Sequence, residues 1–202
     1  MLAGDSDRAV LRDVDILGYQ DTLFVDHGHA RFDGSLVAGT VDFVFGGGAV
    51  LLRGCEIRSR VRPGEATSSG FVAAPSTRRE QPAGLVFDRC RLTRERGVAD
   101  GAVYLARPWR PTLSFAGQRY GDPDAVGMAA FVGCWMDAHI APAGWTAMSY
   151  NGADAQRHWL QPEQARFAEW QSTGPGAAGM RRGRRMTRAD AAHLLALLGA
   201  RL

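Results

Sequence analysis

Apolar residues recur along the chain in short groups that share one pattern. In each group an apolar residue stands three positions before a central residue, and another apolar residue follows the centre within two positions. Such short amphipathic runs are typical of β-strands, and no helical period accompanies them. The groups occupy residues 11–16, 32–37, 52–57, 87–92 and 131–136, with Val14, Ser35, Cys55, Cys90 and Cys134 at their centres.

The spacing between these centres predicts how the strands are joined. From Val14 onward the centres are 21, 20, 35 and 44 residues apart. The short spacings fit bare coils of a solenoid, and the long ones fit coils that carry loops. Because the repeats are β-rich and punctuated by glycine, they favour an all-β fold, a parallel β-helix, over a helical array. Chance similarity of short amphipathic strands is the alternative.

Two acids obey the same period. Asp21 and Asp42 are 21 positions apart, so a chain that coils with this repeat places them on neighbouring strands, about 4.8 Å apart. Two carboxylates at that range cannot both ionise freely, and one pKa should rise. A pair of this kind can divide the roles of nucleophile and acid or base. Two solvated strand acids are the structural alternative.

Three further segments complete the organisation. Residues 60–79 are rich in Gly, Pro, Ser and Thr and are predicted to form a loop. Residues 174–186 are predicted to be a basic connector, and 187–201 a C-terminal helix that Thr187 and Asp190 open as a capping box. Its leucines would pack on the solenoid or cap its end, and binding a partner helix is the alternative.

Composition limits the classes of protein that fit. The 202 residues are 46% hydrophobic and 22% charged, which suits one globular domain over residues 1–202. A net charge of +3 gives no reason to expect a nucleic-acid partner. No stretch approaches the roughly 18 apolar residues of a membrane span. The N-terminus lacks the basic and apolar regions of a signal peptide, so none is predicted.

Cysteine and histidine give no sign of a metal site. The three cysteines contain no CxxC pair, so we expect free, buried thiols, with one disulfide as the alternative. The five histidines show no ligand spacing and are interpreted as surface or turn residues. No metal and no organic cofactor is predicted.

Four segments of the chain resemble pectin methylesterases (pectinesterases). They are Gly-Tyr-Gln-Asp-Thr-Leu-Phe at 18–24, Gly-Thr-Val-Asp-Phe-Val-Phe-Gly at 39–46, Tyr-Leu-Ala-Arg-Pro-Trp at 104–109 and the closing segment 167–177. Residues 69–77 and 120–123 are similar to the secreted bacterial branch of the family. The resemblance covers nearly the whole chain and implies a right-handed parallel β-helix.

The resemblance also implies catalytic roles. Asp42 would be the nucleophile, and Asp21 the general acid that protonates methanol and then activates water. Gln20 would donate hydrogen bonds to the oxyanion. Arg107 would keep Asp42 ionised and oriented, and this role rests on the resemblance alone, because inserted loops defeat the register arithmetic. Independently of the family, ester hydrolysis by a carboxylate nucleophile needs one ionised and one protonated acid side by side.

The implied substrate contacts are aromatic and apolar. Trp109 would stack on a sugar ring, with packing beneath a loop as the alternative. Phe45, Trp145 and Met148 would line the substrate groove, and for Trp145 and Met148 a place in the core remains open. The implied partner is pectin, the implied location is extracellular, and the complete protein is expected to be a monomer.

Two features depart from the family pattern. The family carries a substantial N-terminal stretch before its Gln-Asp-Thr motif, whereas residues 1–19 alone precede Gln20 here. We therefore expect the first coils, an N-terminal cap and a second glutamine of the oxyanion site to be missing, and stability and activity to be low. A misplaced start codon is an equal explanation. Ala106 stands where the family usually has glycine.

The sequence therefore predicts a carboxylic ester hydrolase that demethylates polygalacturonate. Two alternatives remain open at this point. One is a non-catalytic β-helix remnant that at most binds polysaccharide. The other is a family member with a changed substrate, such as a thioesterase, although Arg107 and Trp109 argue against it.

Overall fold

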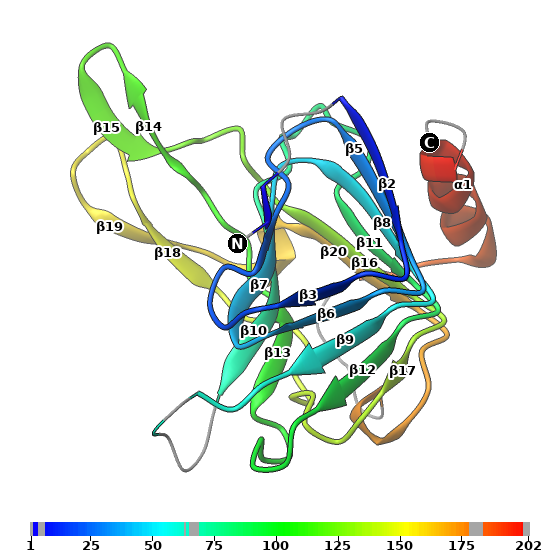
Figure 1. Ribbon diagram of the computed structural model, residues 1–202. Coiled ribbons are helices and arrows are strands. Elements are labelled where there is room, and N and C mark those ends of the chain that lie inside the picture. Colours follow the sequence, from blue (N-terminus) through cyan, green and yellow to red (C-terminus); the bar gives the residue numbers. More distant parts are fainter. Residues whose placement is uncertain (1, 4–6, 63, 65–68, 178–183, 200–202) are drawn as a thin grey trace.

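The computed structural model describes residues 2–3, 7–62, 64, 69–177 and 184–199. The chain winds through three parallel sheets in turn, so each coil adds one strand to each sheet (Figure 1). This is a right-handed parallel β-helix, and the predicted fold class is confirmed. The first sheet contains β1 (Leu2–Ala3), β4 (Leu23–Phe24), β7 (Val41–Gly46), β10 (Gly70–Pro75) and β13 (Val103–Ala106).

The other two sheets complete each coil. The second sheet contains β2 (Arg8–Arg12), β5 (His29–Asp33), β8 (Ala49–Arg53), β11 (Leu85–Asp88), β16 (Met128–Val132), β20 (Arg166–Trp170) and β21 (Arg184–Arg185). The third sheet contains β3 (Asp15–Leu17), β6 (Leu36–Gly39), β9 (Glu56–Ser59), β12 (Arg91–Arg94) and β17 (Trp135–Met136). We number the coils by their first-sheet strands, so β1 opens coil 1 and β13 opens coil 5.

The predicted register of the repeat is confirmed. In the third sheet Asp15 pairs with Leu36, Leu36 with Glu56, and the series continues through Arg91 to Trp135. The five centres of the sequence pattern each precede one of these residues and therefore form a single column. The turn residue before each centre has a left-handed backbone, with φ between 51° and 61° at Asp13, Gly34, Gly54, Arg89 and Gly133.

The three cysteines occupy successive positions of this column. All are buried and free, as predicted. Each Sγ donates to a carbonyl of the preceding coil, from Cys55 to Phe32 (3.3 Å), from Cys90 to Leu52 (3.2 Å) and from Cys134 to Phe87 (3.3 Å). The thiols thus satisfy carbonyls at a corner where the chain leaves one sheet for the next.

The predicted loop over 60–79 is wrong in its later part. Residues 70–75 form β10, which lies between β7 and β13 in the first sheet. Val72, Ala73 and Ala74 are buried there. The glycine- and serine-rich residues in front of this short apolar run obscured a strand whose stability comes from pairing on both sides.

The C-terminal helix α1 (Arg188–Gly199) packs on the outer face of the second sheet (Figure 1). Leu194 and Leu198 are buried against Leu51, Val86 and Ala130. Its capping box is also confirmed, because Thr187 N–H donates to Asp190 Oδ2 (3.0 Å) and Asp190 N–H donates to Thr187 Oγ1 (3.1 Å). Of the predicted connector 174–186 and helix 187–201, residues 178–183 and 200–201 lie outside the described residues.

Two hairpins project from the solenoid, the first within the 44-residue spacing and the second after the last centre, Cys134 (Figure 1). The first joins β14 (Thr112–Phe115) to β15 (Gln118–Gly121), and the second joins β18 (Met148–Asn151) to β19 (Arg157–Leu160). Short 3-10 helices follow at η1 (Pro162–Gln164) and η2 (Pro175–Ala177). Within the described residues, no helix combines the length and apolar character needed to cross a membrane.

The first coil is less buried than the coil that follows. Leu11 and Ile16 point into the solenoid but are only half-buried. Phe32 and Val37, which occupy the same positions one coil later, are 1% and 0% exposed. Strands β1, β2 and β3 are the edges of their sheets. Among the described residues, the first coil therefore buries less apolar surface than the second.

His139 lies in a turn, one of the two positions expected of the histidines, but it is buried and not at the surface. Its side chain is 0% exposed, and neither ring nitrogen has a hydrogen-bond partner among the described residues. The segment after β17 folds inward, with Val103 N–H donating to the His139 carbonyl at 2.9 Å. Burial lowers the pKa of His139 to about 4.

This burial predicts acid-sensitive stability. The unfolded chain binds the His139 proton near pH 6.5 and the folded chain only near pH 4, so stability is full above pH 6.5 and falls as the pH drops toward 4. The loss should be on the order of 3 kcal/mol. Urea unfolding at pH 7 and pH 4.5 measures it. His139→Gln should lose most of this pH dependence, whereas the same change at exposed His193 should keep it; equal behaviour of both variants would contradict the assignment.

Candidate active site

Asp21 and Asp42 lie on neighbouring coils of the first sheet. Leu23 pairs with Val44 and Phe24 with Phe45, so the same register brings Asp21 opposite Asp42. The Asp21 N–H donates to the Val41 carbonyl, next to Asp42, at 3.0 Å. The charge of Asp21 also acts on the Asp42 carboxyl. The 21-residue offset therefore becomes proximity in space, as the sequence predicted.

Both acids have an unusual backbone. Their φ values are 54° at Asp21 and 50° at Asp42, in the left-handed region that few residues other than Gly, Asn and Asp adopt. Asp42 lies in a bulge, because Phe71 pairs with Val41 whereas Ala73 pairs with Val44. Bulges and such backbone conformations are common where a side chain must be directed to a functional position.

Arg107 binds Asp42 with both arms of its guanidinium group. Its Nε donates to Asp42 Oδ1 at 2.9 Å and its Nη2 donates to Oδ2 at 2.6 Å. The guanidinium carbon also lies 3.8 Å from the centroid of the Phe71 ring. Two parallel hydrogen bonds and this stacking fix the orientation of the carboxylate. The structure thus brings together three residues that the sequence had selected, although spacing alone could not place Arg107.

The electrostatics of Asp42 are set by opposing effects. Burial raises the pKa of Asp42, Arg107 lowers it through hydrogen bonding and charge, and the charge of Asp21 raises it again. The pKa of Asp42 is raised overall, because the residue is buried, with 6% of its surface exposed. One raised pKa in the pair was expected, but Arg107 limits the increase at Asp42 rather than reversing it.

Gln20 directly precedes Asp21 and is exposed. The turn that carries both residues is held to the next coil, because Thr40 N–H donates to the Tyr19 carbonyl at 2.7 Å. The Thr22 hydroxyl donates to the same carbonyl at 3.2 Å. The exposed Gln20 amide therefore lies beside Asp21, the less buried of the two acids.

An aromatic row runs beside the acids. The Trp109 ring meets Phe45 edge-on, with centroids 5.8 Å apart, and Phe45 stacks on Phe24 at 4.6 Å. Phe71 stacks on Tyr104 at 5.9 Å under Arg107. Phe24, Phe71 and Tyr104 were not selected from the sequence. Phe24 could have been found from its 21-residue offset to Phe45, whereas inserted loops hide the register of Phe71 and Tyr104.

Met148 and Trp109 line one hollow of ≈ 380 Å³, which lies between residues 109–112, leading into the first hairpin, and the second hairpin. Trp145 lies elsewhere: it is 1% exposed and stacks on Phe167 in the interior at 4.9 Å. The assignment of Trp145 to the substrate groove is therefore wrong. Its segment bridges to Ala106 and directs the indole into the last coils of the solenoid, where a large apolar ring fills the core.

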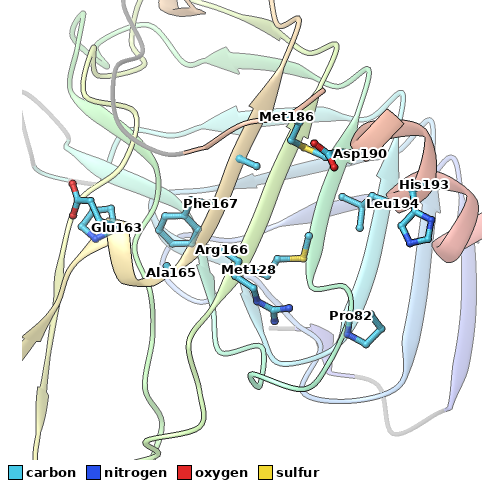
Figure 2. Close-up of a pocket in the computed structure, with 12 residues that line it drawn as sticks. Pro82, Met128, Glu163, Ala165, Arg166, Phe167, Met186, Asp190, His193 and Leu194 are labelled. Carbon is cyan, nitrogen blue, oxygen red and sulfur yellow. The ribbon is translucent and has the colours of Figure 1, made fainter. Parts of the chain in front are cut away.

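A larger hollow of ≈ 600 Å³ lies on another side of the molecule, between α1 and the outer face of β16 and β20 (Figure 2). Met128, Phe167, Met186 and Leu194 form its apolar wall. It is lined by none of the paired acids and lies on a different sheet from Asp42. The smaller hollow is not lined by the acids either, but it adjoins their aromatic row through Trp109, which contacts Phe45. The acids, Arg107 and this row therefore form the candidate site. The described residues contain no group of three or more His, Cys, Asp or Glu side chains placed to hold a metal ion.

The fold and the site define a parallel β-helix protein with two adjacent aspartates, one of which is bound by an arginine. The pectinesterase family model matches residues 1–188. Pectinesterase A of Dickeya chrysanthemi is 42% identical over 189 residues, which cover 92% of this chain and 51% of that protein. Pectinesterase 31 of Arabidopsis thaliana is 31% identical over 178 residues, covering 88% and 46%. The chain therefore belongs to the pectinesterase family.

Solved structures of pectin methylesterases have the same fold as this chain. Pectin methylesterase from Yersinia enterocolitica superposes with a TM-score of 0.88 at 39% identity, covering 94% of this chain and 59% of that one. A pectin methylesterase in complex with a hexasaccharide gives a TM-score of 0.87 at 40% identity, covering 93% and 55%. The chain spans about half the length of the curated bacterial relatives that it matches.

Proposed function

We propose that this chain hydrolyses the methyl esters of polygalacturonate, releasing methanol and leaving a more acidic pectin. The observation that carries the proposal is the fixed Asp42 carboxylate, bound at both oxygens by Arg107 and adjoining Asp21. Family membership supports the same substrate class. Polysaccharide binding without cleavage is the rival outcome.

In the first half of the proposed reaction, an Asp42 oxygen attacks the ester carbonyl carbon. The carbonyl electrons move to oxygen, and the Gln20 amide donates to this oxyanion. As the tetrahedral intermediate collapses, the bond from carbon to the methoxy oxygen breaks. Protonated Asp21 gives its proton to that oxygen, so methanol leaves and an anhydride joins Asp42 to the sugar acid.

In the second half, Asp21 is a carboxylate and acts as a base. It takes a proton from a water molecule, whose oxygen attacks the anhydride carbon of the sugar acid. The bond to Asp42 then breaks. The products are a galacturonic acid, which releases its remaining proton to the solvent and becomes a carboxylate, and a free Asp42 carboxylate, which returns to its two hydrogen bonds with Arg107, while Asp21 is again protonated.

Substrate binding is proposed along the aromatic row. Trp109 and Phe45 would face sugar rings, and Met148 would contact the chain beside Trp109. The complex of a related pectin methylesterase with a hexasaccharide supports a carbohydrate ligand for this surface. Because the proposed substrate is a large polymer, we place the activity outside the cell. A monomeric state stays a prediction.

Methanol release tests the proposal directly. The full chain is incubated with highly methylated pectin, and with fully de-esterified polygalacturonate as the matched control. We expect methanol and new carboxylates to appear in equal amounts from the first polymer, with no methanol from the second. Pectin binding with no methanol above the enzyme-free rate would support the binding protein instead and overturn the esterase.

A further inference from the structure

Arg60, which does not bind either acid, contacts the turn that carries Gln20 and Asp21. Arg60 follows β9 and belongs to coil 3, whereas the turn of residues 18–21 joins β3 to β4 at the same corner of the solenoid. The Arg60 Nη1 donates to the Gly18 carbonyl at 2.8 Å, and its guanidinium carbon lies 4.5 Å from the centroid of the Tyr19 ring. The side chain therefore reaches past one intervening coil to this turn.

Glu95 holds this guanidinium group in place from the other side. Its Oε1 accepts from Arg60 Nε at 3.0 Å, and its Oε2 accepts from the Val61 N–H at 3.0 Å. Partial burial raises the pKa of Glu95, but the Val61 N–H and Arg60 outweigh it and lower the pKa overall. Glu95 is therefore a fixed carboxylate at neutral pH, and the orientation of Arg60 is determined at both ends.

Within the described residues, the backbone of this turn is held from one side. Its hydrogen bonds lead to the next coil, from Gly18 N–H to Ala38, from Thr40 N–H to Tyr19 and from Asp21 N–H to Val41. The turn ends the first described coil, whose strand β3 is an edge of its sheet. Asp21 also keeps a left-handed backbone, which persists only where its surroundings fix it.

We propose that Arg60, oriented by Glu95, is a positioning residue that holds Gln20 and Asp21 at their working distance from Asp42. This inference rests on the function proposed above. Arg60 touches neither acid and takes no part in the chemistry. It fixes the Gly18 carbonyl and the Tyr19 ring, so that the two residues that follow in the chain keep one place relative to Asp42.

The kinetic test uses the full 202-residue chain and methylated pectin. Because Gln20 and Asp21 act in the transition state, Arg60→Ala should lower kcat about 100-fold, the cost of a misplacement near 1 Å. KM should change less than about twofold, because ground-state binding is retained. Arg60→Lys should recover part of kcat, since lysine keeps the charge facing Glu95 but lacks the planar group that stacks on Tyr19.

Arg58 offers a matched control. It lies two residues earlier on β9 and donates to Glu56 Oε1 at 2.9 Å, and Glu56 in turn accepts from Thr93 of β12. The charge of Arg58 also lowers the pKa of Glu95, but its hydrogen bond goes to Glu56 and not to the turn. Arg58→Ala should leave kcat within about twofold of the unmodified chain. Equal kcat losses in both variants would overturn the inference, because they would reflect a general loss of surface ion pairs.

Hydrogen exchange of the backbone amides provides a second measurement that does not depend on turnover. Exchange at Gly18, Asp21 and Thr40 should accelerate about tenfold or more in Arg60→Ala and remain unchanged in Arg58→Ala. Unchanged exchange in Arg60→Ala overturns the inference whatever the activity. If exchange is faster in Arg60→Ala but the unmodified chain releases no methanol, the anchoring role of Arg60 is supported and the esterase function is not. The failure of the anchoring proposal and the failure of the esterase proposal can therefore be distinguished.

Discussion

Replacing Asp42 with asparagine should lower the rate of methanol release from methylated pectin on the order of 10⁵-fold, as expected when a covalent nucleophile is lost. Asparagine has nearly the same shape and can still accept one hydrogen bond from Arg107, so the cleft should stay intact. Its amide cannot form the anhydride, and Gln20 and Asp21 are left with no intermediate to act on. Methanol formation under single-turnover conditions measures the effect.

Asp88 offers a matched control for this substitution. It is also a buried aspartate bound to an arginine, with Arg53 Nε donating to Asp88 Oδ2 at 2.9 Å, but it lies on the second sheet. Asp88→Asn should cost stability, because it weakens a buried ion pair, and should leave the rate per folded molecule unchanged. If Asp42→Asn keeps more than about a hundredth of the rate, Asp42 is not the nucleophile.

Removing Arg107 should have the second largest effect. Arg107→Ala leaves burial and the charge of Asp21 unopposed, so the pKa of Asp42 should rise further. In the proposed reaction Asp42 acts in its ionised form, and the acid limb of kcat/KM should therefore move to higher pH. Together with the lost orientation, we expect a fall of about 10³-fold at pH 7. The full pH profile of kcat/KM separates the two contributions.

Lysine at position 107 refines this prediction. Arg107→Lys keeps a cation near Asp42 but loses the paired hydrogen bonds and the stacking on Phe71. The acid limb should then shift less than in the alanine variant, with most of the rate loss coming from orientation. The same change at Arg53, which pairs with Asp88, should leave the profile in place. An acid limb that stays fixed in both Arg107 variants would show that Arg107 does not set the ionisation of Asp42.

Much of the solenoid could be predicted because its coils repeat the same corner. The five centres of the sequence pattern lie between a second-sheet strand and the following third-sheet strand, and they stack in one column. Their spacing therefore gives the length of each coil. Asp21 and Asp42 belong to two short coils and inherit this register. Arg107 comes 65 residues after Asp42, beyond the long connection that contains β10, and its distance from the acids depends on how many residues loop out.

Burial in the last coils was harder to predict for a related reason. Trp145 and His139 follow β17 in a segment with many turn residues, which resembles an exposed loop. The segment instead folds against β13, through bridges from Ile140 to Val103 and from Trp145 to Ala106. No alternation of apolar and polar residues marks these two contacts. The sequence therefore left Trp145 open between the groove and the core, and it placed His139 at the surface or in a turn.

The division of the proposed machinery between coils has a consequence for how heat would inactivate the chain. Leu11 and Ile16 of the first described coil are half-buried, whereas Phe32 and Val37 of the next coil are fully buried. Local opening begins where the least apolar surface is buried. Opening there would displace Asp21, the proposed proton donor, while Asp42 keeps its two hydrogen bonds with Arg107. Turnover should therefore cease at a lower temperature than the one at which the remaining coils melt.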